Sequence, residues 1–554
     1  VNDSVTNLIF ELSKDPQKII NYNLKYADEL LSLTSNIYQR HFEKSDKEND
    51  IEPLYKADCK DRRFKSNMWN SNPFFDYISQ VYLLNCNLVN QFLDDCDYSG
   101  NLTRRKINFF ARYALDALSP SNFMLTSPEI IKAALESNGQ TIVNGLNNFY
   151  KDLQKSKDNF SITTTAQNIF KIGENIASSK GEVIYKNELM ELIHYYPVGK
   201  KVYETPILII PAWINKYYIF DLTKKNSMIN WLLEKQYNVF VISWRNPDEK
   251  LANIEFANYM NDGVIAAINQ IENITKSPQV SAMGYCLGGT LLAMTLSYFA
   301  KIKDNRIKSA SFLTTLLDFA DAGDISLFIN NEQIDKIENK MEKNGLFNGK
   351  DLSAIFSILR ANDMIWSFFV NNYLLGNDPI PFDLLYWNSD VTNLPAKMHN
   401  FYLRNMYLEN NLIQPDKIKF NDVGINLADI NIPTYFLATK EDHIAPWKSV
   451  FKATKLLNKS MKFILSESGH VAGVINHPNK NKYGFWSNEN NELDDKKWLD
   501  NATRVSGSWW DNWHDWQSQF SDNMIEAVMP QNNKSYEAAP GDYVKQQYNN
   551  DNIS

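Results

Sequence analysis

A short glycine-rich segment with a cysteine at its centre constrains the fold of this chain more than any other feature. The segment Gly284-Tyr285-Cys286-Leu287-Gly288-Gly289 follows the strand-like residues 279–283 and precedes the helix-like residues 290–300. Glycines two positions before and two positions after the cysteine indicate a strand-to-helix turn that is too tight for Cβ atoms. The sequence therefore predicts Cys286 as a nucleophile and the Leu287 N–H as an oxyanion donor at a helix N-terminus. The alternative is a buried structural cysteine on a glycine-rich turn.

Two later segments supply an acid and a base in the order nucleophile, acid, histidine. The strand-like residues 434–438 lead to Asp442, and the strand-like residues 462–465 lead to His470. This order, with each group on a loop after a strand, is that of the α/β-hydrolases. His443 is the alternative base because it adjoins the acid, and Asp318 is the alternative acid because it also follows a strand-like segment. The sequence favours Cys286, Asp442 and His470 as the catalytic residues.

The pattern of apolar residues predicts two unlike parts. Residues 1–176 have apolar residues at helical spacing and are expected to form a mainly helical N-terminal domain. From 177 to 554, short β-rich segments alternate with helix-length ones, which predicts an α/β-hydrolase domain whose mostly parallel sheet has helices on both faces. The long aromatic-rich stretch from about 318 to 431 is expected to be a helical cap inserted over the carboxyl ends of the strands. The expected strands are 207–210, 239–243, 279–283, 309–315, 434–438 and 462–465.

Charge, hydropathy and cysteine content exclude several classes of protein. The chain has 57 Lys and Arg residues against 65 Asp and Glu residues, a formal net charge of −8, which argues against a nucleic-acid binder. No apolar stretch approaches the ~20 residues that span a bilayer, so we expect no transmembrane segment. The four cysteines form no C-x-x-C pair, and no metal-ligand spacing is present, so we expect neither a disulfide framework nor a metal site. The first residues do not have the pattern of a secretory signal, and we expect a cytoplasmic protein.

A cysteine nucleophile also indicates the kind of acyl donor. A thiolate that attacks a thioester exchanges one thioester for another at little change in free energy, so the acyl group stays activated on the enzyme. His470 would raise the thiolate fraction of Cys286 by accepting its proton. This chemistry favours acyl transfer from a thioester to a hydroxyl.

Ordered motifs along nearly the whole chain resemble the class I polyhydroxyalkanoate (poly-3-hydroxybutyrate) synthases. The matching segments are DALSPSNF (116–123), NELMELI (187–193), WINKYY (213–218), GYCLGG (284–289), LTTLLDF (313–319), LYWN (385–388), FYLRN (401–405), DHIAPW (442–447), SGHVAGV (468–474), GSWW (507–510) and APGDYV (539–544).

This resemblance implies an acyltransferase that polymerises (R)-3-hydroxyacyl-CoA, chiefly 3-hydroxybutyryl-CoA, and releases CoA. It implies that Cys286 carries the acyl chain as a thioester, that His470 deprotonates Cys286, and that Asp442 helps to activate the incoming 3-hydroxyl. A second oxyanion donor is expected near Ile214, in the loop after strand 207–210. The resemblance further implies a homodimer at the surface of cytoplasmic polyester granules. No cofactor is expected, since CoA is a product.

Two other functions and one structural question stay open at the level of sequence. A cysteine hydrolase of the dienelactone-hydrolase type also has a G-Y-C-x-G-G elbow, and a non-catalytic granule-associated scaffold could retain a hydrolase fold. The aromatic cluster at 509–516 could contact polymer or pack in the core. Aromatic residues at helical spacing usually pack in a core, so we expect burial.

Overall fold

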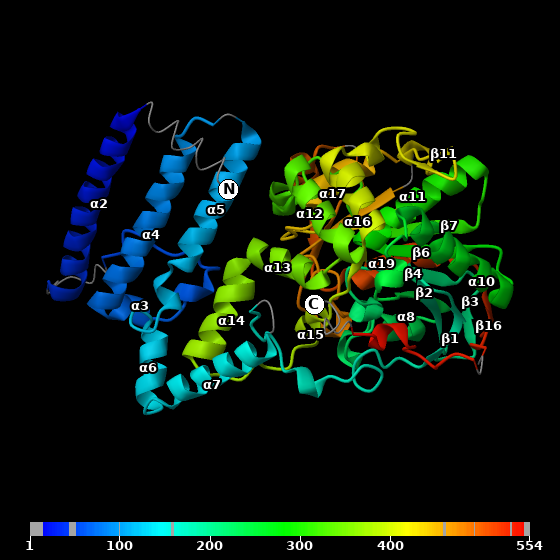
Figure 1. Cartoon of the computed structure of the whole chain (residues 1–554), viewed down its shortest axis with the longest axis horizontal. Helices are drawn as coiled ribbons and strands as arrows, with labels where there is room; N and C mark the ends of the chain where they lie inside the picture. Colours follow the sequence, from blue (N-terminus) through cyan, green and yellow to red (C-terminus); the bar gives the residue numbers. More distant parts are fainter. Residues whose placement is uncertain are drawn as a thin grey trace. The chain divides into compact units, whose positions relative to one another are not determined.

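The computed structural model describes residues 15–43, 51–98, 100–156, 160–457, 461–491, 493–531 and 535–547. The chain forms two compact units (Figure 1). Unit 1 contains Val1–Ala166 and Phe356–Ile380, and unit 2 contains Gln167–Ile355 and Pro381–Ser554. Among the described helices, none is both long enough and apolar enough to cross a membrane.

Unit 1 is helical, and its helices begin where the sequence supplies a start signal. Proline occupies the first turn of α2, α4 and α6, where a missing N–H leaves no intrahelical bond unmade. Ser127 occupies the N-cap position of α6. A small core of Leu33, Ile37, Leu84 and Leu88 joins α2 to α4. The longer elements are α2 (Pro16–Phe42), α3 (Met68–Ser71), α4 (Pro73–Asp94), α5 (Asn101–Ala117), α6 (Pro128–Glu136) and α7 (Gln140–Lys155).

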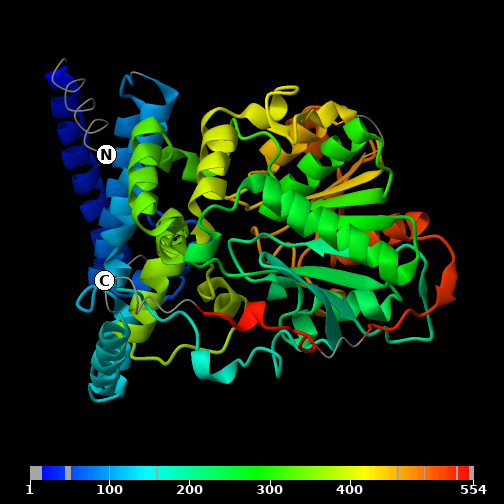
Figure 2. The same ribbon diagram turned by 45° about the vertical axis from the view of Figure 1, so that its right-hand side comes forward.

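A later segment of the chain returns to unit 1 and packs on α7. This segment contains the end of α13 (Gly349–Leu359), α14 (Ser367–Phe369) and the two π-helical segments η9 (Asn362–Trp366) and η10 (Val370–Leu374). In Figure 2 its yellow-green ribbon runs alongside the blue helices. The side-chain amide of Asn148 donates hydrogen bonds to the carbonyls of Asn372 (3.3 Å) and Asn377 (3.1 Å), and the Tyr373 hydroxyl donates to Asp152 (2.5 Å).

These contacts explain why the compact units differ from the sequence-based division. We predicted domains at 1–176 and 177–554, with the whole of about 318–431 as a cap on the second domain. Phe356–Ile380 groups instead with the N-terminal helices, because polar groups on α7 bind its backbone. The functional domain limits themselves stay a prediction.

Unit 2 is built on a ten-stranded sheet with the order β1-β2-β5-β4-β6-β7-β12-β13-β14-β15. The six central strands, β5 to β13 in this order, are parallel, and the four outer strands pair antiparallel. All six predicted strands are present. The strands are β1 (Gly181–Lys186), β2 (Met190–Tyr195), β4 (Ile207–Ile210), β5 (Val239–Trp244), β6 (Val280–Tyr285), β7 (Ile307–Leu313), β12 (Thr434–Thr439), β13 (Met461–Ser466), β14 (Phe485–Ser487) and β15 (Thr503–Val505).

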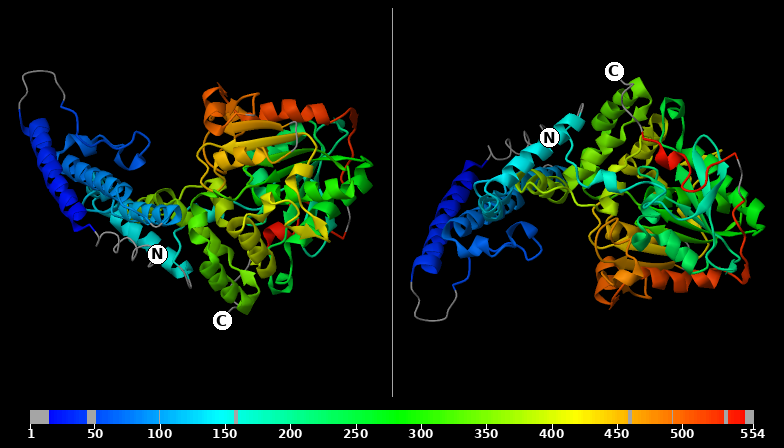
Figure 3. Two further views of the ribbon diagram at one scale, coloured as in Figure 1. Left: turned by 90° about the horizontal axis from the view of Figure 1, so that it is seen from above. Right: turned by 90° about the horizontal axis from the view of Figure 1, so that it is seen from below.

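Both faces of this sheet are buried under helices, as seen from above and below in Figure 3. Along β4, Leu208 and Ile210 belong to one buried cluster, whereas Ile207 and Ile209 belong to the other. Successive side chains of a strand point to opposite faces, so the continuous apolar sequence of β4 serves two cores. Helices α10 (Ala266–Thr275) and α11 (Leu287–Ile302) supply the first core, and α8 (Met228–Glu234) and α19 (Trp509–Gln517) supply the second.

The predicted insertion lies between β7 and β12, which are neighbours in the sheet. The part of the insertion that belongs to unit 2 is mostly helical and includes α12 (Asn331–Asn344), α15 (Asp383–Ser389) and α16 (Ala396–Tyr402). The parallel sheet, the helices on both faces and the insertion confirm the predicted α/β-hydrolase fold with a helical cap.

The aromatic cluster at 509–516 forms α19, and the prediction that it is buried is confirmed. Trp509, Trp510, Trp513 and Trp516 are all buried in the second core. The Trp513 indole donates a hydrogen bond to the Ser311 hydroxyl of β7 at 2.8 Å. The cluster therefore anchors the C-terminal part of the chain to the sheet.

Candidate active site

Cys286 lies in the turn between β6 and α11 in a strained backbone conformation. Strand β6 ends at Tyr285, helix α11 begins at Leu287, and Cys286 between them has φ +50° and ψ −121°. A positive φ is uncommon for a residue with a side chain and is found where the surroundings enforce it. The Cys286 N–H donates to the carbonyl of Leu313 at 2.9 Å, which holds this turn against β7.

The glycines around Cys286 occupy positions where a side chain would collide with backbone or side-chain atoms. A Cβ on Gly284 would lie 2.5 Å from the Cα of Gly289, and one on Gly288 would lie 2.2 Å from the carbonyl oxygen of Ile210. A Cβ on Gly289 would lie 2.0 Å from Oγ1 of Thr315. These distances are far below van der Waals contact, so the tight turn that the motif predicts is present.

The structure brings His470 and Asp442 together from the loops that follow β13 and β12. Nδ1 of His470 lies 2.7 Å from Oδ2 of Asp442, and both side chains are buried. The other carboxylate oxygen of Asp442 accepts hydrogen bonds from the N–H groups of Ile444 and Ala445, both at 2.8 Å. Both oxygens of Asp442 are therefore engaged, which fixes the ring of His470.

The environment of His470 favours its charged form. Burial by itself lowers the pKa of His470, but the charges of Asp442 and of the Cys286 thiolate, with hydrogen bonds to both side chains, raise it to about 10. Because Nδ1 faces Asp442, the opposite nitrogen of the ring is the one available to Cys286. An imidazolium beside Sγ favours the thiolate, which is the reactive form of cysteine.

The alternative acid and base do not join this cluster. Asp318 accepts a hydrogen bond from the Asn410 amide (2.8 Å) and lies 3.4 Å from the Lys452 ammonium. Burial raises the pKa of Asp318, but the hydrogen bonds and the charge of Lys452 outweigh burial and lower it. His443 adjoins Asp442 in sequence, yet the Asp442 carboxylate binds His470.

The two predicted oxyanion donors lie on adjacent pieces of backbone. Leu287 is the first residue of α11, so its N–H has no intrahelical acceptor. Ile214 is half-buried in the loop after β4. A Cβ on Gly288 would lie 2.7 Å from the carbonyl oxygen of Pro211, so this loop passes directly against the elbow. The roles of Leu287 and Ile214 as donors stay a prediction.

Two cap tyrosines close to Cys286 were not identified from the sequence. Burial raises the pKa of Tyr402 and of Tyr407, and the charge of Cys286 raises both further. The two side chains also share a hydrogen bond. Tyr402 lies within the FYLRN segment of the resemblance, but only the fold brings it from α16 towards the elbow.

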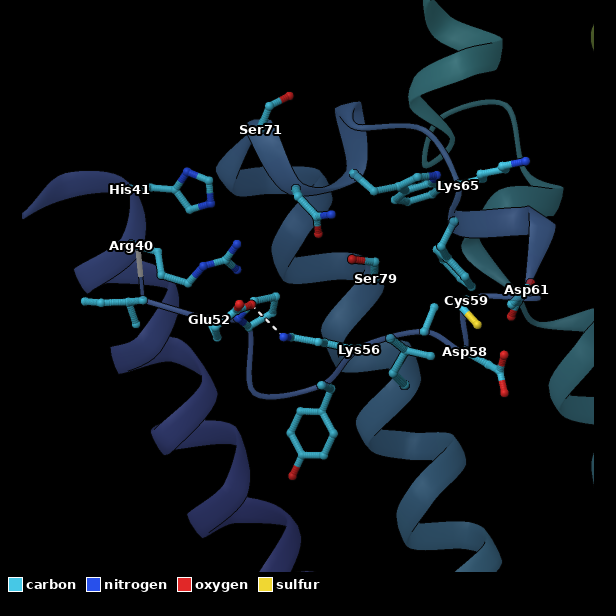
Figure 4. A pocket seen from close by; sticks show the side chains of 18 of the residues that line it. Arg40, His41, Glu52, Lys56, Asp58, Cys59, Asp61, Lys65, Ser71 and Ser79 are labelled. Atoms are coloured by element: carbon cyan, nitrogen blue, oxygen red, sulfur yellow. Dashed lines mark ion pairs between the residues drawn. The ribbon is translucent and has the colours of Figure 1, made fainter. Parts of the chain in front are cut away.

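Outside the cluster of Cys286, His470 and Asp442, the described residues include no group of three or more His, Cys, Asp or Glu side chains that could hold a metal ion. A hollow of about 1080 Å³ lies within unit 1, and charged side chains of both signs line it, including the ion pair of Lys56 with Glu52 at 2.6 Å (Figure 4). None of the predicted site residues is among those that line this hollow.

Comparisons with known families match most of the chain. The family described as "Poly-beta-hydroxybutyrate polymerase (PhaC) N-terminus" matches residues 60–232, and the family described as "alpha/beta hydrolase fold" matches residues 205–476. The second match covers the elbow, Asp442 and His470.

Curated relatives are similar over nearly the full length. A poly(3-hydroxyalkanoate) polymerase subunit PhaC of Rhizobium etli is 37% identical over 98% of this chain and 86% of the relative. A poly(3-hydroxyalkanoate) polymerase of Methylorubrum extorquens is 39% identical over 96% of this chain and 87% of the relative. Among solved structures, an esterase from Exiguobacterium antarcticum covers 53% of this chain and 93% of its own length, with 12% identity and a TM-score of 0.30.

Proposed function

Since the chain belongs to the poly(3-hydroxyalkanoate) polymerase family, we propose that it polymerises (R)-3-hydroxyacyl-CoA, chiefly 3-hydroxybutyryl-CoA, with release of CoA. The single observation that carries the mechanism is the His470 ring, which Asp442 holds on one side and which faces Cys286 on the other. The chain is thus an acyltransferase in which Cys286 is the proposed nucleophile.

In the first step, the Cys286 thiolate attacks the thioester carbonyl of the substrate. The negative charge that develops on the carbonyl oxygen is stabilised by the N–H groups of Leu287 and Ile214. The tetrahedral intermediate collapses, the bond from carbon to the CoA sulfur breaks, and CoA leaves with the proton that His470 held. The acyl group is then bound to Cys286 as a thioester, and His470 is neutral.

In the second step, neutral His470 accepts the proton of a 3-hydroxyl group, and the hydroxyl oxygen attacks the acyl thioester. An ester bond forms, the bond from carbon to Sγ of Cys286 breaks, and the imidazolium–thiolate pair is restored. Both oxygens of Asp442 are engaged, so the geometry favours activation of the hydroxyl by Asp442 through His470. The scheme requires no cofactor.

The experiment that tests this function follows CoA and polymer together. Purified protein is mixed with (R)-3-hydroxybutyryl-CoA, CoA release is followed with a thiol-reactive dye, and polymer is followed by turbidity. We expect Cys286→Ala to lower the rate by about 10⁴-fold or more, because the nucleophile is lost. The exposed Cys59 provides the matched control, since Cys59→Ala should keep full activity.

Three outcomes would contradict the proposal. Full activity of Cys286→Ala would remove the nucleophile from the mechanism. Free 3-hydroxybutyrate without polymer would indicate a cysteine hydrolase. If no CoA were released at all, the remaining interpretation would be a non-catalytic granule-associated scaffold.

We propose further that the enzyme acts in the cytoplasm as a homodimer at the surface of the polyester granule. The apolar residues of α7 support a contact with the granule: Val143, Leu146, Tyr150 and Leu153 form one face and are 45–63% exposed, whereas the opposite face of the helix is polar and buried. Residues 137–150 contain no charged side chain. An aliphatic polyester is also uncharged, so this face matches it chemically.

A single charge on α7 tests the granule contact. We expect Leu146→Glu to lower the fraction of enzyme that sediments with granules by about tenfold, because a carboxylate loses its hydration against an apolar surface. Asn144→Glu is the control, since Asn144 is exposed away from the apolar face. Sedimentation velocity of the same variants tests the dimer, and a loss of dimer in Leu146→Glu would assign the face to a second copy instead.

A further inference from the structure

A buried lysine holds the loop that carries Ile214. The Lys216 side chain is 2% exposed, and its ammonium donates hydrogen bonds to the carbonyls of Val544 (2.8 Å) and Gln546 (2.7 Å). It also lies 3.7 Å from a carboxylate oxygen of Asp390. The other oxygen of Asp390 accepts a hydrogen bond from the Tyr218 hydroxyl at 2.9 Å.

The backbone of the same loop is bound by α15 and by the segment that follows it. The Trp387 indole donates to the carbonyl of Lys216 at 2.7 Å, and the Thr392 hydroxyl donates to the carbonyl of Trp213. Asn215 and Val391 form an antiparallel backbone bridge. Residues 213–216 are therefore held by the backbone on one side and by the Lys216 side chain on the other.

The two carbonyls that Lys216 binds belong to the C-terminal strap, which we define as residues 535–547. The buried Glu191 of β2 accepts hydrogen bonds from the N–H groups of Asp542 (3.1 Å) and Tyr543 (3.0 Å). The Tyr543 hydroxyl donates to the carbonyl of Asn187 at 2.6 Å. Because the strap is bound to β2 in this way, it presents the carbonyls of Val544 and Gln546 to Lys216 at a fixed place.

Packing alone does not explain why a charged side chain occupies this buried position. Transfer of an ammonium into a buried site is unfavourable unless hydrogen bonds and an opposite charge compensate the lost hydration. A leucine or methionine would fill the same space without that cost. Burial lowers the pKa of Lys216 and raises that of Asp390, while each group favours the charged form of the other. Lys216 is thus a long donor that joins two segments more than 320 residues apart in the sequence.

We propose that Lys216 is a positioning residue, which places the Ile214 N–H in the oxyanion hole by joining its loop to the C-terminal strap. This inference deepens the proposed function and rests on its assignment of Ile214 as a donor. A displacement of an oxyanion donor by about 1 Å lowers acyl-transfer rates by one to two orders of magnitude. The reactivity of the Cys286–His470 pair does not depend on that donor.

The test separates reactions that form an oxyanion from one that does not. Lys216→Met in the full chain is acylated with (R)-3-hydroxybutyryl-CoA and, separately, with p-nitrophenyl acetate, and its Cys286 is alkylated with iodoacetamide. Both acyl donors form an oxyanion on the carbonyl carbon, whereas alkylation does not. We expect kcat for both acylations to fall by about 10- to 100-fold with little change in KM, and the alkylation rate to stay that of the wild type.

Three further variants control for unpaired charge and for general loss of structure. Lys216→Met leaves Asp390 without its partner, so Lys216→Met/Asp390→Asn should show the same pattern without that penalty. Glu191→Gln weakens the binding of the strap and should lower acylation, again with unchanged alkylation. Lys225→Met is the surface control and should match the wild type in all three reactions.

Each result decides between defined outcomes. Unchanged acylation in Lys216→Met, or equal losses of acylation and alkylation, would overturn the role of Lys216 in the oxyanion hole. A wild type that p-nitrophenyl acetate acylates, but that releases no CoA, would refute the proposed polymerase function and leave the test of Lys216 valid.

Discussion

At the scale of single residues, His470 is held in its charged form beside Cys286. The pKa of His470 is raised to about 10, so its imidazolium persists at every pH below that value. A protonated His470 stabilises negative charge on the side chain of the facing Cys286. This stabilisation is present below the pKa of His470 and is lost as the pH rises through about 10.

The first prediction concerns alkylation of Cys286 by iodoacetamide. At pH 7, we expect His470→Gln to lower the rate by about tenfold or more, because the imidazolium that stabilises negative charge on Sγ is lost. The difference should disappear as the pH rises through about 10, where His470 loses its proton. His443→Gln is the matched control and should match the wild type. Equal rates of the wild type and His470→Gln at pH 7 would contradict the ion pair.

How far single residues can be predicted depends on where their partners lie in the chain. Cys286, Asp442 and His470 each follow a strand, so their local sequence marks them, and the structure brings the three together. Lys216 has no such local signal, because its partners Val544 and Gln546 lie at the other end of the chain. The proximity of the cap tyrosines to Cys286 arises in the same way, through folding alone.

At the scale of elements, α19 binds the loop that carries His470. The Trp509 indole donates to the carbonyls of Gly473 and Val474, both at 3.1 Å, and the Trp510 indole donates to Val474 at 2.9 Å. Buried acceptors that lose their donor keep the cost of lost hydration. The buried tryptophans of α19 therefore hold the loop of His470 in place and also fill the second core.

The second prediction tests that link with a substitution that keeps an aromatic ring. We expect Trp509→Phe to lower the free energy of unfolding by about 1–2 kcal/mol, because it removes the N–H that binds the carbonyls of Gly473 and Val474, which keep only the Ser466 hydroxyl and the Trp510 indole as donors. Asp515→Asn, on the exposed side of the same helix, should change stability by less than about 0.5 kcal/mol. Urea denaturation gives both values, and equal stabilities of the two variants would contradict the anchoring role.

Elements with a clear apolar pattern could be predicted, and elements with buried polar residues could not. The central strands are nearly continuous apolar runs, as parallel strands covered on both faces require. Strand β2 is also fully buried, but it contains Glu191 and His194, which find partners only in the folded chain. Strands β14 and β15 are three residues long, too short for a periodic signal.

At the scale of the whole molecule, the two units have cores of very different size. Among the described residues, the apolar cluster between α2 and α4 of unit 1 contains four buried residues, whereas unit 2 has two extensive buried clusters on the faces of its sheet. A small core buries little apolar surface per residue, so we expect unit 1 to unfold at a lower denaturant concentration than unit 2. The sequence does not predict that residues 356–380 belong to unit 1, because the hydrogen bonds that hold them there use backbone carbonyls, which every residue has.

The last prediction separates the two units by a substitution in the smaller core. Leu84 is fully buried in unit 1, and Leu84→Ala should lower the stability of that unit by about 2–5 kcal/mol, because it leaves a cavity. Of the 13 tryptophans, only Trp69 and Trp366 lie in unit 1, so fluorescence reports mainly on unit 2, while far-UV circular dichroism reports on the helices of both. We expect the first urea transition by circular dichroism to move to lower concentration while the main fluorescence transition stays in place. Leu24→Ala, at a position 65% exposed on α2, should move neither. A single transition that both probes report, displaced as a whole by Leu84→Ala, would show instead that the two units unfold as one.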